Sequence, residues 1–248
     1  MSASAPAPQF DLAEAVKHLS ARDEHLKLLI AETPPFQMDQ DPLQSPYEAL
    51  LEAITYQSIS GKAASTIFAR IKALGSNGRA PTPQQVLKIR KPALRKAGLS
   101  GAKIAAFKDL AAKTISGVVP SLEDAHKLSD DALIERLTSV RGVGAWTVEM
   151  FLMFRLGRPD VLPIHDLGVQ KGWSVTYGKK HRPKPKALLA FGERWRPFRT
   201  VASWYMWRAC HRAGPAALRK IRPAKTKPRD NSKTRAPGTV KRRQIANR

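Results

Sequence analysis

The chain has 248 residues, enough for one large domain or for two lobes that each bury a core. Its 43 lysines and arginines against 20 acids give a formal net charge of +23, which favours a polyanionic partner, nucleic acid first, over a mere solubility charge. The single cysteine, Cys210, excludes an intrachain disulfide or a site of several thiolates, and it fits a reducing compartment.

The predicted elements are helices along the whole chain. Residues 1–9 are expected to be a disordered lead without a secretory signal. The spacing of apolar residues and N-cap signals then predicts helices over 11–31, 46–57, 63–74, from Thr82 onward, 92–97, 102–115, 121–127, 130–139, 145–157, 166–173, 186–194 and 197–213. Residues 216–248 are expected to be a disordered basic tail. No useful segment alternates with period two and no apolar run reaches the ~18 residues of a membrane helix, so the fold class is all-α.

A glycine pair stands between two of these predicted helices. Gly142 and Gly144 lie one residue apart, and a tight hairpin there needs the positive φ and close backbone approach that glycine tolerates. The helix from 145 then begins with unpaired N–H groups and its positive dipole end, which can hold a phosphate. The alternative for so short a pattern is an ordinary turn.

The surroundings of the hairpin carry a resemblance. The segments Leu137–Thr147 and Pro163–Leu167 resemble the hairpin and the catalytic-Asp segment of the helix-hairpin-helix DNA glycosylase superfamily, in particular its DNA-3-methyladenine glycosylase II branch. Three further segments agree, and the resemblance covers about residues 10–213. These segments are Gln57–Ser60 with Ala63 and Ala64, Gly98–Lys103, and Arg194–Arg199 followed by Trp204 and Trp207.

The resemblance implies an architecture of two helical lobes with the helix-hairpin-helix motif at the cleft between them. The central lobe is expected to span 46–155, and the terminal lobe to combine 10–45 with 156–215. The expected form is short and purely helical, because about 45 residues before the first matching helix leave no room for an additional β-rich domain.

Asp166 is the predicted catalytic residue. Hydrolysis of an N-glycosidic bond builds positive charge on the sugar, and an ionised carboxylate can stabilise that charge and orient the attacking water. The alternative is that Asp166 only caps the helix that follows it, and both roles can coexist. The resemblance implies a monofunctional enzyme that leaves an abasic site, because Trp146 stands where strand-cutting members carry a Schiff-base lysine.

The resemblance also implies a base pocket and a DNA-binding surface. A flipped, positively charged alkylpurine favours aromatic faces, and the pocket residues are expected to be Trp146, Trp207, Met150 and Leu167, with core packing as the alternative for the tryptophans. Met150 and Leu167 replace aromatics of the bacterial prototype, which puts the lesion range in doubt. The predicted DNA-binding residues are Arg141, Gly142, Val143, Gly144 and Thr147, with Ser58 or Ile59 as the wedge that fills the gap left by the base.

The predicted partner is double-stranded DNA with alkylated bases, bound by a monomer without membrane association. No organic cofactor is implied, an iron–sulfur cluster is excluded by the single cysteine, and a monovalent cation at the hairpin carbonyls is compatible with the resemblance. The expected location is the cytoplasm with the nucleoid in a bacterium, or the nucleus in a eukaryote. The competing hypotheses are a non-catalytic DNA-binding protein, a glycosylase for another lesion, and an RNA-associated basic protein.

Overall fold

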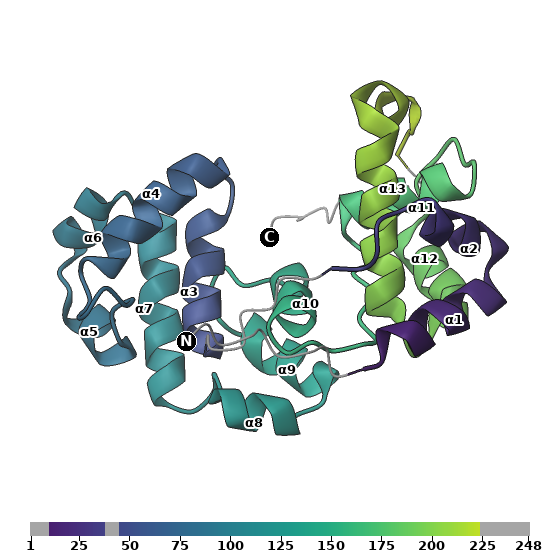
Figure 1. Ribbon diagram of the computed structural model, residues 1–248. Helices are drawn as coiled ribbons and strands as arrows, with labels where there is room; N and C mark the ends of the chain where they lie inside the picture. The colour runs from purple at the N-terminus through teal and green to yellow at the C-terminus, as the bar shows by residue number, and fades with distance from the viewer. Residues whose placement is uncertain (1–9, 38–44, 224–248) are drawn as a thin grey trace, which may run out of the picture.

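The computed structural model describes residues 10–37 and 45–223 of the chain. Within these ranges the protein is helical, with one isolated bridge between His181 and Arg222 and no β-strand. The helices form two groups with α10 (Ala145–Phe154) between them (Figure 1). The all-α fold class with two helical lobes is confirmed. None of the helices in the described ranges is long and apolar enough to cross a bilayer.

One lobe contains the helices of the middle of the chain. They are α3 (Pro46–Tyr56), α4 (Gly61–Lys72), α5 (Pro83–Lys88), α6 (Lys91–Ala97), α7 (Gly101–Ile115), α8 (Leu122–Lys127), α9 (Asp130–Thr138) and α10. Their apolar faces enclose one core around Leu50, Ile54, Phe107 and Leu110, all at most 1% exposed. Burial of such side chains is the main stabilising term of the lobe, because each large apolar side chain contributes about 1.5–3 kcal/mol.

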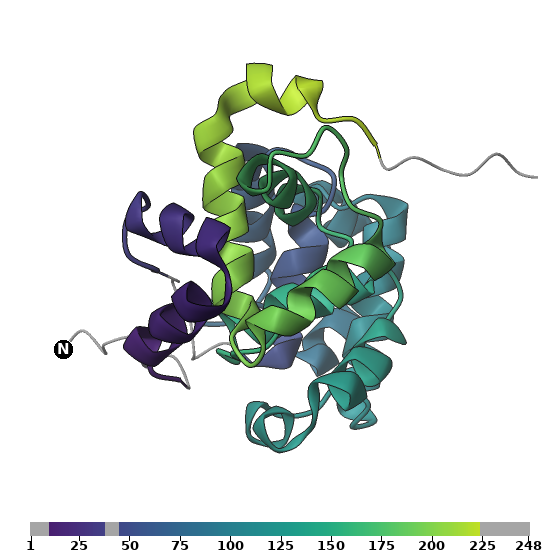
Figure 2. The same cartoon turned by 90° about the vertical axis from the view of Figure 1, so that its right-hand side faces the viewer.

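The other lobe joins the two ends of the described chain. It contains α1 (Leu12–Arg22), α2 (Glu24–Ala31), α11 (Leu167–Thr176), α12 (Pro185–Gly192), a short 3₁₀ helix (Glu193–Trp195) and α13 (Arg199–Lys220). The helices α1 and α2 lie beside α13, as the rotated view in Figure 2 shows. A second core forms around Leu19, Leu26, Trp195 and Tyr205, and Trp207 packs against both cores.

Side chains at the helix starts explain where most helices begin. The predicted N-caps Thr82, Ser121 and Ser129 each accept a backbone N–H of the first turn, and Thr82 forms a full capping box with Gln85. The N-terminus of α10 differs, because its N-cap is Gly144 and no side chain caps it. Its first N–H groups are therefore left for an external acceptor.

Two predicted boundaries are wrong. The single helix expected over 11–31 is two helices, because Asp23 adopts an extended conformation and its carboxylate accepts hydrogen bonds from the Leu26 N–H, the Tyr177 hydroxyl and the Trp195 indole. The disordered tail was expected to start at residue 216, but α13 continues through Lys220, beyond a kink at Gly214. Arg222 then exchanges backbone hydrogen bonds with residues 180 and 182. The expected disorder of 1–9 and of 224–248 concerns segments outside the described residues.

Candidate active site

Asp166 lies at the first turn of α11, at the cleft between the lobes. Its Oδ1 accepts the N–H of Val169 at 2.8 Å and the indole N–H of Trp207 at 2.8 Å, while Oδ2 accepts the indole N–H of Trp146 at 2.7 Å. The side chain is therefore a helix cap and also the meeting point of three elements, α10, α11 and α13. A carboxylate offers about four acceptor sites, so one site on Oδ2 remains for a water or a substrate.

The Asp166 carboxylate faces a cavity of about 480 Å³ between α10 and α13. Trp207 is stacked on Phe154 with 5.9 Å between ring centroids, and the Arg208 guanidinium lies 4.4 Å from the ring centroid of Trp204. The cavity is bounded by Gln37, Trp146, Met150, Phe154, Asp166, Trp204, Trp207, Arg208 and His211. A space walled by aromatic and thioether groups with one carboxylate suits a flat, electron-poor ring.

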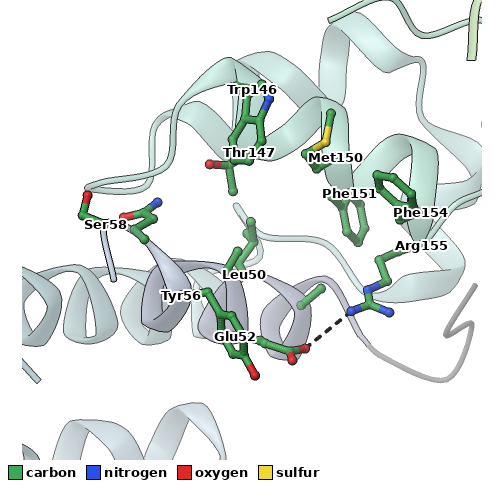
Figure 3. A pocket seen from close by; sticks show the side chains of 13 residues that line it. Leu50, Glu52, Tyr56, Ser58, Trp146, Thr147, Met150, Phe151, Phe154 and Arg155 are labelled. Atoms are coloured by element: carbon green, nitrogen blue, oxygen red, sulfur yellow. Dashed lines mark hydrogen bonds and ion pairs between the residues drawn. The ribbon is translucent and has the colours of Figure 1, made fainter. Parts of the chain in front are cut away.

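A second cavity of about 600 Å³ lies on the other side of Trp146, between α3 and α10 (Figure 3). It shares Trp146, Met150 and Phe154 with the first cavity but does not reach Asp166. These three residues stand four apart on one face of α10 and form a common wall. Across from them, the Glu52 carboxylate of α3 pairs with Arg155 at 3.4 Å. Of the two cavities, only the smaller contains the Asp166 carboxylate, whereas the larger contains Glu52.

Glu149 is a second carboxyl group near Asp166. One of its oxygens, Oε2, is buried without a hydrogen-bond partner in the described part of the chain. Burial, and to a smaller extent repulsion from Asp166, raise the pKa of Glu149 to about 7. At neutral pH, Glu149 is therefore protonated far more often than an ordinary glutamate, which is ionised.

The hairpin between α9 and α10 is held by side chains from other helices. Gly142 has φ 78°, as expected for a tight turn, whereas Gly144 has φ −102° and does not need the left-handed region. Gln57 donates its amide N–H to the Gly142 carbonyl at 2.9 Å, and Asp109 accepts the Arg141 N–H at 2.7 Å. Space around the Cα of Gly144 is open, since an added Cβ would meet no atom within 4 Å.

The turn between α3 and α4 contains the two wedge candidates. Ser58 adopts φ 58°, which is uncommon for a residue with a side chain, and the Ile59 side chain is 39% exposed. Lys103 donates to the carbonyls of Thr55 at 2.7 Å and Gln57 at 2.8 Å, and burial lowers the pKa of its amine. The turn is thus anchored to α7 on one side and to the hairpin on the other.

The structure brings most, but not all, of the predicted site residues together. Trp146, Trp207 and Met150 surround the cavity that contains Asp166, whereas Leu167 is 55% exposed and lines neither cavity. Of the predicted DNA-binding residues, Arg141, Gly142, Gly144, Ser58 and Ile59 are exposed. Val143 and Thr147 are buried, and the Val143 N–H already donates to the Val140 carbonyl.

The sequence analysis did not predict four side chains that lie at this site: Gln57, which binds the hairpin, Glu149, Phe154 and Arg208. Helical spacing was the available signal for two of them, because Phe154 lies eight residues after Trp146 and Arg208 four after Trp204. Two basic residues in the segments that carry the resemblance bind protein groups. Lys103 binds carbonyls, and buried Arg199 pairs with Asp160 at 2.6 Å.

Three backbone carbonyls at the hairpin each accept one hydrogen bond from the protein, and because a carbonyl oxygen has two lone pairs, the monovalent cation stays a prediction. The Ser139 carbonyl accepts from Lys113, the Val140 carbonyl from the Val143 N–H, and the Gly142 carbonyl from Gln57. Within the described ranges, no group of three or more histidine, cysteine or acidic side chains is placed to hold a metal ion.

Comparison with known proteins identifies the family to which the sequence and the fold are similar. Residues 51–197 match the family described as HhH-GPD superfamily base excision DNA repair protein. DNA-3-methyladenine glycosylase 1 of Schizosaccharomyces pombe is 39% identical over 198 residues, which cover 79% of this chain and 87% of the relative. The solved structure of an S. pombe 3-methyladenine DNA glycosylase in complex with abasic DNA has a TM-score of 0.71 and 39% identity, with 79% of this chain and 95% of that chain covered.

A DNA-3-methyladenine glycosidase from Bacillus halodurans, 34% identical, superimposes with a TM-score of 0.74 over 83% of this chain and 94% of its own. The match to the family model extends over more than half of the chain, from the helix α3 through the hairpin and Asp166 to the start of α13. On this evidence, the chain belongs to the HhH-GPD superfamily of base excision DNA repair proteins.

Proposed function

We propose that this protein is a monofunctional DNA glycosylase that hydrolyses the N-glycosidic bond of alkylated purines, such as 3-methyladenine and 7-methylguanine, in duplex DNA. The observation that carries the proposal is the Asp166 carboxylate, which faces an aromatic cavity and accepts the indole N–H groups of both Trp146 and Trp207. A passive DNA clamp needs neither this carboxylate nor the aromatic cavity. Two S. pombe relatives support the proposal: DNA-3-methyladenine glycosylase 1, at 39% identity over 87% of its length, and the alkylbase DNA glycosidase-like protein mag2, at 30% identity over 97% of its length.

In this mechanism the damaged nucleotide leaves the base stack and enters the cleft. The bond between the sugar C1′ and the base nitrogen breaks with its electrons on the base, so a cationic alkylpurine departs as a neutral molecule. The ionised Asp166 stabilises the positive charge that develops on the sugar. A water at the remaining acceptor site of Oδ2 gives its oxygen to C1′ and its proton to the carboxylate, which leaves an abasic site.

The flipped base is expected to stack on Trp146. The Trp207 ring is stacked on Phe154, and the Trp204 ring is covered by Arg208. Trp146 is 48% exposed, and in the described residues no aromatic or cationic side chain packs on its ring. An uncovered indole face beside a carboxylate attracts a cationic purine more strongly than a neutral one, which favours alkylated over normal bases.

The DNA backbone is expected to lie against the uncapped start of α10. Gly144 leaves room for a phosphate, the first N–H groups of α10 supply donors, and the exposed Arg141 adds charge. Ile59, on the anchored turn after α3, is the proposed wedge. The protein is proposed to bind duplex DNA as a monomer, and so to act in the nucleoid or the nucleus.

The decisive experiment compares base release by the wild type and by Asp166→Asn on methylated duplex DNA. Asparagine also caps helices well, so the fold should persist, while the loss of charge should lower the rate of 3-methyladenine release by about 100-fold or more. DNA affinity should stay within about twofold. Equal activity of the Asn variant would reduce Asp166 to a helix cap, and a wild type that binds DNA but releases no base would point to the non-catalytic alternative.

A further inference from the structure

One face of α13 presents a group of side chains to the Asp166 cavity. Trp204, Trp207, Arg208 and His211 occupy positions i, i+3, i+4 and i+7, so they lie on the same side of the helix. Trp207 donates to Asp166, and Arg208 is the next residue in the chain. A guanidinium group thus lines the same cavity as the carboxylate at which the sugar is expected to react.

The charge of Arg208 is held in place but not neutralised. Its guanidinium lies 4.4 Å from the Trp204 ring centroid, and Trp204 itself is 5% exposed and packed on Phe36 at 5.2 Å. No carboxylate lies within ion-pair distance of Arg208 in residues 10–37 and 45–223. Stacking on an aromatic ring orients the planar head and leaves its N–H donors for another acceptor.

The next arginine along the helix shows the opposite arrangement. Arg212 donates to the Glu32 carboxylate at 2.6 Å and to the Thr33 hydroxyl at 3.3 Å, and it lies at a different cavity, away from Asp166. The two arginines are one turn apart on the same helix, yet only Arg212 is paired with an acid. Arg208 is therefore the residue whose charge is available for a ligand in the cleft.

We propose that Arg208 is a positioning residue that binds a phosphate flanking the flipped nucleotide and so holds the deoxyribose against Asp166; this rests on the proposed glycosylase function. A phosphate is a better partner than the base, because a fixed cation beside a cationic alkylpurine is repulsive. The phosphates are joined directly to the sugar that faces Asp166, and a planar guanidinium binds a phosphate with two parallel hydrogen bonds. Arg208 and the hairpin would then bind the DNA backbone from opposite lobes.

The test measures binding of a duplex with a stable abasic-site analogue, and of the same duplex undamaged, at several salt concentrations. For Arg208→Ala we expect about 10-fold weaker binding of the abasic duplex, as for the loss of one charge-assisted contact, and a salt slope smaller by about 0.9. Arg208→Lys should keep the slope but not the full affinity, because it retains the charge without the fork. Arg212→Ala is the matched control and should bind like the wild type.

The rate of 7-methylguanine release under single-turnover conditions separates the remaining outcomes. A slower release by Arg208→Ala, partly restored in Arg208→Lys, supports positioning of the sugar. Unchanged affinity and salt slope would overturn the proposal, and faster release with unchanged affinity would make Arg208 a filter against cationic bases instead. The binding measurements do not depend on base release. If the wild type releases no base but Arg208→Ala still shows weaker binding and a smaller salt slope, the glycosylase function is wrong and the phosphate contact is supported.

Discussion

The indole N–H of Trp146 donates a 2.7 Å hydrogen bond to Oδ2 of Asp166, across the boundary between α10 and the first turn of α11. Trp146 directly follows the hairpin's Gly144–Ala145 step, so the same short segment contacts both the expected DNA backbone and the expected reacting centre. An aromatic face and an N–H donor are combined in one side chain. This permits the two contributions to be separated by substitution.

Trp146→Phe keeps an aromatic face but removes the donor to Asp166. Because a hydrogen bond to a charged group is worth about 1.5–3 kcal/mol, we expect base release to slow by about 10-fold or more while DNA binding is retained. Trp146→Ala, which also removes the ring, should in addition lose affinity for the free base as an inhibitor. Trp173→Phe is the control, since the Trp173 indole N–H is buried without a partner in the described residues. Unchanged base release by Trp146→Phe would show that the N–H group contributes nothing, and equal losses in the Phe and Ala variants would show that the aromatic ring contributes nothing.

Ile59→Ala tests the wedge. Removal of the exposed apolar side chain should slow excision of a lesion that is paired in a duplex by about fivefold, because the vacated space in the stack is no longer filled. Excision of the same lesion from an unpaired bulge should change little. Leu87, equally exposed at 42% on α5, provides the control Leu87→Ala. Equal losses on paired and bulged lesions would assign Ile59 a general packing role.

Glu149 predicts a pH-dependent stability. Its pKa is raised in the folded protein to about 7 from 4.5, so the folded state binds the proton more tightly than the unfolded state. Stability from this group is therefore present below about pH 4.5 and is lost as the pH rises through about 7. Glu149→Gln should remove this loss. The melting temperature of the variant minus that of the wild type should therefore be larger at pH 8 than at pH 5, by about 3 °C.

The comparison uses melting curves of wild type, Glu149→Gln and Glu135→Gln at pH 5 and pH 8. Glu135 is exposed on α9, so its substitution should have no pH-dependent effect. The same pH-dependent change in melting temperature for both variants would show that the environment of Glu149 does not raise its pKa.

Gly172 determines how closely α11 approaches α13. A Cβ at this position would lie 1.8 Å from the Met206 carbonyl oxygen, which is backbone and cannot rotate away. Gly172→Ala should therefore destabilise the protein by about 3 kcal/mol or more, or separate the two helices. Either effect should weaken the Trp207–Asp166 contact and lower activity. Gly101→Ala, where the added methyl meets no atom within 4 Å, should be at least as stable as the wild type.

The local part of this structure followed from the sequence. The N-caps Thr82, Ser121 and Ser129, the all-α class and the positive φ of Gly142 all depend on residues within a few positions of one another. The wrong prediction of one helix over 11–31, in contrast, has a cause in the tertiary structure. Asp23 interrupts the first predicted helix and accepts hydrogen bonds from Tyr177 and Trp195, which lie more than 150 residues later.

The sequence by itself determined most of the helices, their caps and the hairpin, because helical periodicity and capping are encoded within single turns. The resemblance of the segment Pro163–Leu167 to a known family is what made Asp166 the candidate carboxylate. Only the tertiary structure decided which side chains meet that carboxylate. The indoles of Trp146 and Trp207 reach Asp166 from positions 20 and 41 residues away in the chain. They do so because one core holds α10 and the other holds α11 and α13, and the two cores meet at this site. The same packing turned Leu167 out to solvent and brought Arg208 to the cavity, choices that depend on how two cores dock and that no spacing along the chain contains.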